Sequence, residues 1–296
     1  VLQESVFSKK IDAKTFATFG EMLYKFKGFF VRTRSIRKYP LNTASNVMGY
    51  LGEVNSKKIQ EDNYYTSGDL IGVSGVEVAY ENLLRGEKGM ELVLVDVHNS
   101  KKGKFNEGRY DTNAVSGLHI TTTIDADLQK YGEKLMEDKI GSIVAIEPST
   151  GEILSLVSSP TFNPNTLTGR KRTENFKQLL SHEHKPLFNR ALLGQYAPGS
   201  TFKLITGLIA MQEKTLIAYA NYNCNGGYEY ANEKTVACHE HSTPISMKKA
   251  IAISCNSYFC NVFQKLFDKY PNTEAAFSKW ENHVASFGVG QWMNND

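Results

Sequence analysis

A serine and a lysine three residues apart offer the clearest chemistry in the chain. Ser200 and Lys203 stand at the start of an apolar stretch that runs from Leu204 to Met211. Pro198 favours the first turn of a helix, where its missing N–H costs nothing, and Gly199 lets a substrate approach the backbone closely. Residues at this spacing share one face of a helix, so the amine of Lys203 can take the hydroxyl proton of Ser200. The segment therefore predicts a serine nucleophile with a lysine as general base.

The spacing alone is not selective, because Ser-x-x-Lys occurs three times in the sequence. The alternating pattern around Ser35, which precedes Lys38, predicts an exposed strand. Ser246, which precedes Lys249, has the place of a cap for a helix that begins near Met247. Only the serine at position 200 follows a Pro-Gly pair and leads into an apolar helix.

A second polar pair, Ser254 and Asn256, lies further along the chain beside another apolar stretch. A hydroxyl and a carboxamide that reach a catalytic lysine have clear uses. The hydroxyl relays a proton to a leaving amine, and the amide holds the lysine and the substrate backbone. The alternative is an ordinary polar helix face, which is common at helix boundaries.

The two pairs together resemble the catalytic motifs of penicillin-binding proteins and class A β-lactamases. Other segments resemble the class B penicillin-binding proteins, and most closely the elongation-type transpeptidases known as penicillin-binding protein 2. These segments are the pedestal signatures Arg37 to Pro40, Gly49 to Gly52, Gly72 to Glu77, Tyr80 to Gly86 and Gly89, the start of the transpeptidase domain at Gly117 to Gln129, and its first hairpin at Ala145 to Val157.

This resemblance implies an α+β fold in two parts. We expect an extended pedestal, or dimerisation-type, domain over residues 1–116. A partial transpeptidase domain of the serine β-lactamase-like kind is expected over residues 117–296, with its sheet covered by helices. The family completes its site with a Lys-Thr-Gly or Lys-Ser-Gly strand, and neither tripeptide occurs in the 296 residues. We therefore expect a fragment that stops before this motif and does not turn over substrate by itself.

Local signals predict individual elements. Asp12 is placed to cap a helix that ends near Gly28, and Ser74 to cap another that ends at Arg85-Gly86. Further predictions are a strand over residues 91–97, a charged turn over 99–108 and a helix from Asp125 through Glu137. Residues 143–146 and 153–157 are expected to pair as a hairpin.

The composition is that of an ordinary globular chain, with 41% hydrophobic and 22% charged residues. A net charge of +3 is too small to indicate nucleic-acid binding, and no basic stretch interleaved with aromatics is present. No apolar run reaches the roughly 18 to 20 residues of a membrane span. The resemblance nevertheless implies a periplasmic protein on the inner membrane, anchored by an N-terminal helix that this chain lacks.

The family's activity is acyl transfer on peptidoglycan stem peptides that end in D-Ala-D-Ala. The resemblance implies that Ser200 forms an acyl-enzyme, which β-lactams imitate by acylating the same serine, and that Lys203, Ser254 and Asn256 assist. A membrane glycosyltransferase is the expected partner of the pedestal. Two alternatives stay open: a serine β-lactamase-type hydrolase, and a non-catalytic interaction module for a cell-wall glycosyltransferase.

Three cysteines and a histidine complete a possible metal site. Cys3His is a full tetrahedral set for structural Zn²⁺. Some elongation-type relatives place metal ligands in similar positions, and the resemblance then implies Cys224, Cys238, His241 and Cys255, with His239 as a substitute. The alternatives are a disulfide between the first two cysteines and a third that is simply buried. Cys260 is expected in the core on either interpretation.

Overall fold

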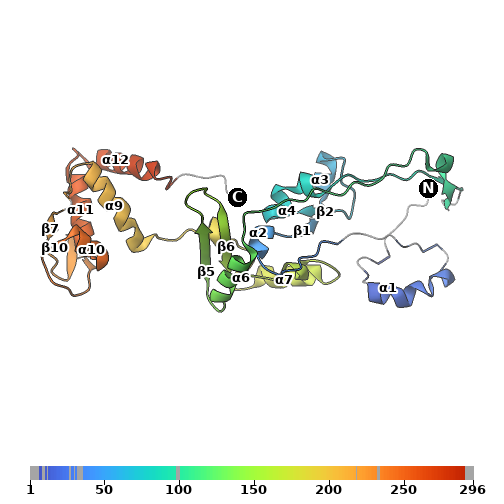
Figure 1. The fold of residues 1–296 in the computed structure, drawn as a ribbon, viewed down its shortest axis with the longest axis horizontal. Helices are drawn as coiled ribbons and strands as arrows, with labels where there is room; N and C mark the ends of the chain where they lie inside the picture. The colour runs from blue at the N-terminus through green and yellow to red at the C-terminus, as the bar shows by residue number, and fades with distance from the viewer. Residues whose placement is uncertain are drawn as a thin grey trace. The chain divides into compact units, whose positions relative to one another are not determined.

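The chain forms two compact units in the computed structural model, Val1–Gly194 and Gln195–Asp296 (Figure 1). The structure describes residues 7–8, 11, 13–26, 28–29, 31, 36–97, 101–217, 219–231 and 234–290. Each unit mixes helices with two-stranded antiparallel sheets. This composition confirms the α+β prediction.

Among its described residues, the first unit contains short helices and three antiparallel strand pairs. The pairs are β1 with β2, β3 with β4, and β5 with β6, and two isolated bridges join residues near 87–90 to residues near 112–115. Its elements are α1 (Ala13–Gly20), η1 (Leu23–Lys25), α2 (Ser45–Met48), β1 (Leu51–Glu53), α3 (Ser56–Glu61), β2 (Leu70–Gly72), α4 (Gly75–Ala79), α5 (Glu81–Leu84), β3 (Val93–Val95), β4 (Lys101–Lys104), η2 (Phe105–Gly108), α6 (Ala126–Leu135), β5 (Gly141–Ile146), β6 (Ile153–Ser159), η3 (Pro164–Leu167), α7 (Arg172–Ser181) and α8 (Arg190–Leu193).

The predicted hairpin is confirmed as β5 and β6, whose register pairs Ile143 with Val157. Helices α6 and α8 pack against it. Gln129 of α6 is 1% exposed. Its side-chain oxygen accepts from the Leu156 N–H at 2.8 Å, and its side-chain nitrogen donates to the Leu156 carbonyl at 3.1 Å. A buried amide that pairs with both backbone groups of one strand residue fixes the helix at that point.

Segments far apart in the sequence are joined within the first unit. Glu133 accepts from the Ala44 N–H at 2.7 Å, and the side-chain oxygen of Asn165 accepts from the Tyr39 N–H at 3.0 Å. These bonds tie the pedestal signatures to residues that follow the predicted boundary at residues 116–117. The compact unit therefore extends to Gly194, while the boundary between pedestal and transpeptidase domains stays a prediction.

Several local predictions differ from the structure in extent. Ser74 has the N-cap position but makes no side-chain capping bond, and the helix after it is divided into α4 and α5, because Tyr80 between them leaves helical geometry at φ −114°. The helix that Asp125 caps ends at Leu135, and the expected turn over 99–108 contains β4. The first helix ends at Gly20 rather than Gly28. Asp12, its expected cap, lies outside the described residues.

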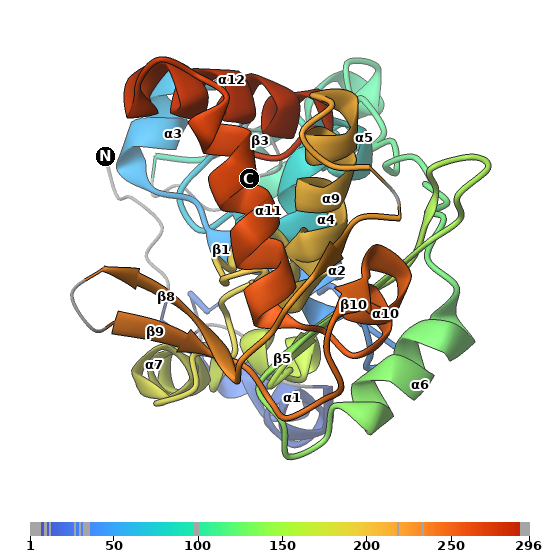
Figure 2. The same cartoon turned by 90° about the vertical axis from the view of Figure 1, so that its left-hand side faces the viewer.

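The second unit is mainly helical, with two small strand pairs, β8 with β9 and β7 with β10. Helices α9, α11 and α12 contact one another (Figure 2). Its elements are η4 (Gly199–Thr201), α9 (Phe202–Gln212), β7 (Asn221–Tyr222), β8 (Gly227–Ala231), β9 (Lys234–Ala237), β10 (Ile245–Ser246), α10 (Met247–Ala252), α11 (Asn256–Asp268) and α12 (Thr273–Ser286).

Two buried clusters hold these helices together. One surrounds the start of α11 and includes Cys255 and Tyr258, both 0% exposed. The other joins the three long helices through Ile209, Leu266 and Val284. Apolar burial of this kind supplies most of the stability of a small helical unit, so the helix ends are free to carry polar groups.

Candidate active site and metal centre

Ser200 lies in the turn that leads into α9. The turn η4 is closed by the Thr201 hydroxyl, which donates to the Pro198 carbonyl at 2.6 Å. Gly199 has φ +59°, and no atom lies within 4 Å of the place where its Cβ would stand. The Ser200 side chain is exposed, and its hydroxyl has no hydrogen-bond partner among the described residues. The nucleophile candidate therefore faces open space beside a glycine.

Lys203 stands in the first turn of α9, and its side-chain nitrogen is held by the second polar pair. Its Nζ donates to the Ser254 carbonyl at 2.7 Å and to Asn256 Oδ1 at 2.6 Å. It also lies 3.1 Å from the Ser254 hydroxyl oxygen. The structure therefore brings together three of the four predicted catalytic residues, with the serine of η4 one turn away on the same helix.

The three partners of the lysine differ in what they can do. The carbonyl and amide oxygens only accept hydrogen bonds, whereas the Ser254 hydroxyl can accept or donate. A proton can consequently pass between this hydroxyl and the lysine amine in either direction. This is the arrangement that a relay to a leaving group requires.

Ser254 has a strained backbone. Its φ of +55° is in the left-handed region, which non-glycine residues seldom adopt. This conformation turns its carbonyl toward Lys203 between α10 and α11. Strain of this kind costs on the order of 1–3 kcal/mol and persists only where its surroundings hold it, often at functional sites.

The amide of Asn256 can point in only one direction. Its Nδ2 donates to the Ala237 carbonyl at 2.8 Å, while its Oδ1 accepts from Lys203. Reversing the amide would set a carbonyl against a carbonyl and an NH₂ against an ammonium group, so neither bond would survive. The end of β9 thus fixes the group that holds the lysine.

The other two Ser-x-x-Lys segments have no such surroundings. Ser246 has the N-cap position of α10, but its side chain makes no capping hydrogen bond, and Lys249 donates to Ser242 at 2.5 Å. Ser35 lies outside the described residues. Context, rather than spacing, separates Ser200 from them.

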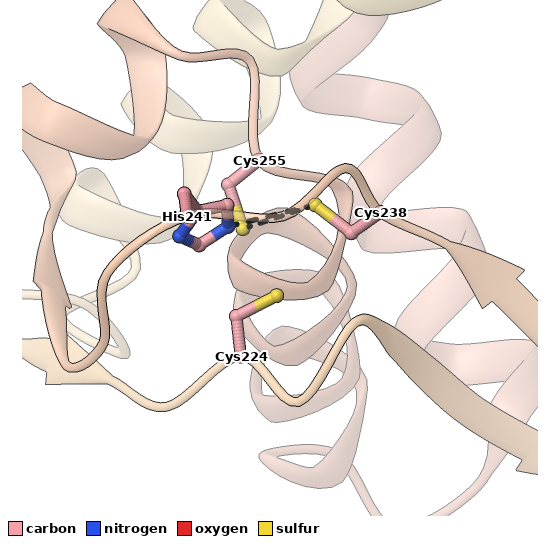
Figure 3. A group of neighbouring side chains, drawn as sticks. All are labelled: Cys224, Cys238, His241 and Cys255. Atoms are coloured by element: carbon pink, nitrogen blue, oxygen red, sulfur yellow. Dashed lines mark hydrogen bonds between the residues drawn. The ribbon is translucent and has the colours of Figure 1, made fainter.

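Four candidate metal ligands converge in the second unit. One sulfur or nitrogen atom from each of Cys224, Cys238, His241 and Cys255 lies within 4.8 Å of the others (Figure 3). These residues come from the loops after β7 and β9 and from the start of α11. His239 is exposed and lies outside the group. All four cysteines are free thiols in the structure, including Cys260, which is not in the cluster.

Two of the distances between ligand atoms match those of a tetrahedral zinc site. Zn–S bonds of about 2.3 Å and Zn–N bonds of about 2.0–2.1 Å place two sulfurs about 3.8 Å apart and a sulfur and a nitrogen about 3.6 Å apart. Cys238 Sγ lies 3.7 Å from Cys255 Sγ and 3.7 Å from His241 Nε2. The cluster could therefore hold a metal ion.

Groups around the cluster favour a thiolate at Cys238 and a fixed imidazole at His241. His241 Nδ1 lies 3.0 Å from the Ser242 carbonyl, which leaves Nε2 free as a ligand. Burial alone would raise the pKa of the Cys238 thiol. The backbone N–H groups of Ser257 and Asn256 and the His241 side chain outweigh this effect and lower the pKa to about 6. Burial raises the pKa of Cys255 to about 12. The two cysteines that flank Asn256 in space thus have pKa values shifted in opposite directions.

The Cys3His cluster and the lysine site share a segment of backbone. Cys255 stands between Ser254 and Asn256, and the Asn256 N–H lies 3.3 Å from Cys238 Sγ. A displacement of the cysteine loop would therefore move the groups that hold Lys203.

Sequence reasoning missed two groups. The carbonyl of Ala237 has no signature of its own, although the residue directly precedes a predicted ligand. Glu213, which follows α9, is only 10% exposed at its side chain and accepts from Lys269 at 2.5 Å, from Tyr270 at 2.6 Å and from His283 at 2.6 Å. A glutamate in Gln-Glu-Lys after a helix gives no sign of this burial.

The contacts of Glu213 predict that the second unit loses folding stability at acidic pH. The hydrogen bond from Lys269, followed by those from Tyr270 and His283, lowers its pKa from 4.5 to about 2. Because the folded pKa is depressed, its stabilisation is present above about pH 4.5 and is lost as the pH falls through 2. Glu213→Gln should therefore flatten the decline in stability over this window, measured by tryptophan fluorescence. An unchanged decline would contradict the assignment.

Comparison with known proteins decides the family. A model of the penicillin-binding protein transpeptidase domain matches residues 141–296, and a model of the penicillin-binding protein dimerisation domain matches residues 2–122. The chain belongs to the penicillin-binding protein family. The peptidoglycan D,D-transpeptidase MrdA of Acinetobacter baumannii is 34% identical over 250 residues, which cover 82% of this chain and 36% of that protein.

Solved structures agree with this placement in the family. A Pseudomonas aeruginosa PBP2 in complex with WCK 5153 gives a TM-score of 0.70 at 26% identity, covering 88% of this chain and 52% of the other. A second structure is described as "Structural coordination of polymerization and crosslinking by a peptidoglycan synthase complex". It gives a TM-score of 0.74 at 26% identity, covering 96% of this chain and 50% of the other. The chain thus spans about half of these structures. Together the matches confirm a class B penicillin-binding protein of the penicillin-binding protein 2 type.

Proposed function

We propose that this chain is the pedestal and nucleophile-bearing part of a peptidoglycan D,D-transpeptidase. The observation that supports this proposal most is the pair of hydrogen bonds from Lys203 to Ser254 and Asn256. Lys203 follows the exposed Ser200 by one helical turn. The substrate would be a stem peptide that ends in D-Ala-D-Ala. β-Lactams would acylate the same serine.

The proposed reaction has two acyl transfers. The Ser200 oxygen attacks the carbonyl of the penultimate D-alanine while Lys203 takes the hydroxyl proton, and the N–H at the helix start stabilises the developing oxyanion. The bond to the terminal D-alanine breaks, and Ser254 relays the proton to its amine. Asn256 holds the peptide. An amine from a neighbouring strand then attacks the ester, forms the cross-linking amide and returns the hydroxyl to the serine.

Labelling with a fluorescent penicillin tests this function and separates it from the hydrolase alternative. In the full-length protein that carries this chain, we expect a covalent adduct that persists after unbound penicillin is removed. A serine β-lactamase-type hydrolase would lose the adduct quickly by deacylation. The match of residues 2–122 to a dimerisation domain favours the transpeptidase. Absence of any adduct would leave the non-catalytic interaction module as the better description.

We also propose that the Cys3His cluster binds a structural Zn²⁺. The observations in its favour are the convergent ligand atoms and their tetrahedral spacing. The ion would supply no bond-making chemistry. Cys238 and Cys255 would instead hold Ser254 and Asn256 in place from behind the lysine site.

The zinc proposal predicts about one ion per chain in protein purified without added metal. Cys238→Ser should lose most of the metal and lower the melting temperature of the second unit, because an ion that binds only the folded state stabilises it. Cys260→Ser is the matched control and should keep the metal. Elemental analysis that finds no zinc, together with a Cys224–Cys238 disulfide in the intact mass, would contradict the proposal.

The pedestal is proposed as the docking part for a membrane glycosyltransferase, on the outer face of the cytoplasmic membrane where peptidoglycan is assembled. The pedestal model match is the supporting observation. None of the helices in the described ranges is long and apolar enough to span a bilayer. Co-purification of the full-length protein with the glycosyltransferase, and its loss when residues 1–116 are removed, tests the partner. Labelling by a membrane-impermeant thiol reagent in intact cells tests the location.

A further inference from the structure

Glu213 forms a half-buried polar cluster at the end of α9 that the proposed reaction does not use. Its Oε2 accepts from Lys269 Nζ and the Tyr270 hydroxyl, and its Oε1 accepts from His283 Nε2. Because a carboxylate has only acceptors, the ring nitrogen of His283 must carry the hydrogen. The histidine side chain is 13% exposed. Groups from the ends of α9 and α11 and from the last turn of α12 therefore meet at one carboxylate.

The carboxylate of Glu213 does not stabilise its own helix, α9. Glu213 directly follows the last residue of α9, where the helix dipole is negative and a negative charge is disfavoured. Lys269 directly follows α11 and also donates to the Glu213 backbone carbonyl at 2.8 Å. The hydrogen bonds from Lys269, Tyr270 and His283 offset the unfavourable interaction of the carboxylate with the helix dipole. The cluster therefore fixes how the ends of α9, α11 and α12 contact one another.

The helices α9 and α11 run in the same direction, with the lysine site at the other end. Lys203 and Asn256 meet near the two helix starts, and Glu213 and Lys269 meet just beyond the two helix ends. Ten residues of helix separate the two contacts along α9, or roughly 15 Å at 1.5 Å per residue. Polar contacts thus join α9 and α11 at both ends.

Between these contacts the packing is apolar. Ile209 of α9 and Leu266 of α11 belong to one buried cluster, against which Phe202, Ile205 and Trp280 pack. Apolar packing is non-directional and tolerates small sliding of one helix past another. Hydrogen bonds near 2.6 Å do not tolerate it, so the polar ends set the register.

We propose that Glu213 is a positioning residue of the lysine site. By fixing the ends of α9 and α11, it sets the register that places Asn256 Oδ1 at 2.6 Å from Lys203 Nζ. Its effect on acylation rests on the proposed transpeptidase function. Its effect on the geometry of the two helix starts does not.

The first test measures geometry in this chain. Asn256 reports the register through its side-chain NH₂ signals in NMR spectra, since Nδ2 is bonded to the Ala237 carbonyl. Glu213→Gln should shift these signals and speed their hydrogen exchange several-fold. Glu281→Gln, an exposed glutamate on α12, is the matched control and should leave them unchanged. If Glu213→Gln leaves the Asn256 signals and their exchange as in the wild type, the proposal is overturned.

The second test measures rate in the full-length protein. Glu213→Gln should slow acylation by fluorescent penicillin roughly ten-fold, since a small misplacement of reacting groups has a large kinetic effect. The fraction finally labelled should stay complete. A merely destabilised variant would lose labelled fraction at an unchanged rate, and that outcome would overturn the proposal. Lack of Ser200-dependent labelling in the wild type would instead overturn the transpeptidase function, and the NMR result would still decide the geometry.

Discussion

Ser200→Ala is expected to abolish covalent labelling of the full-length protein by fluorescent penicillin. The exposed Ser200 hydroxyl in η4 lies beside Gly199, and the lysine held by Ser254 and Asn256 follows it by one turn. Without that oxygen no ester can form, so the loss should be complete rather than partial. The measurement is in-gel fluorescence after the adduct has been denatured.

A matched serine makes this result interpretable. Ser246→Ala removes a hydroxyl at the same sequence spacing from a lysine, but Lys249 donates to Ser242 rather than to the Ser254 and Asn256 pair. It should leave labelling unchanged. Persistent labelling of Ser200→Ala, or loss of labelling in Ser246→Ala with the fold intact, would defeat the assignment of the nucleophile.

Lys203→Met should slow acylation by about 10³-fold, within the range for loss of a general base. Methionine keeps the length of the side chain and its packing while removing the amine. Ser254 and Asn256 would then lose their common partner. The rate constant of adduct formation should fall, whereas reversible penicillin binding, measured by competition, should change little. Stopped-flow or quenched labelling gives the two quantities separately.

The control for this variant is another lysine of the second unit. Lys248→Met replaces an exposed side chain on α10 and should acylate at the wild-type rate. A Lys203→Met protein that acylates within a few-fold of the wild type would show that the base lies elsewhere.

Much of the fold could be predicted from local signals with a direct physical cause. The β5–β6 hairpin has β-branched and aliphatic residues on both sides of Pro148-Ser149-Thr150-Gly151, and it formed in the expected place. Asp125 caps α6 by accepting from the N–H groups of Asp127 and Leu128. Helix ends were less predictable. Tyr80 interrupts the helix after Ser74, although its residue type gives no warning.

The site was predictable in its residue types and not in its supports. The contacts of Lys203 with Ser254 and Asn256 follow from motif and spacing. The carbonyl that orients Asn256 belongs to Ala237, and any residue there would supply the same group. The left-handed φ of Ser254 likewise depends on tertiary context rather than on its side chain.

The metal cluster shows a similar division. The sequence supplied a complete ligand set with His241 as the expected histidine, but it left His239 as a substitute because both follow Cys238 closely. The structure places His241 Nε2 at 3.7 Å from Cys238 Sγ. The choice is made by the backbone of the loop between β9 and β10, which local patterns do not specify.

The identity of the acylated residue tests the central claim most directly. The full-length protein is labelled with penicillin and digested with trypsin, and the adduct is located by tandem mass spectrometry. The predicted result is one modified peptide, residues 191–203, with the penicilloyl group on Ser200 and none on Thr201. An adduct on Ser246, Ser254 or any other residue, with the 191–203 peptide unmodified, would contradict the account.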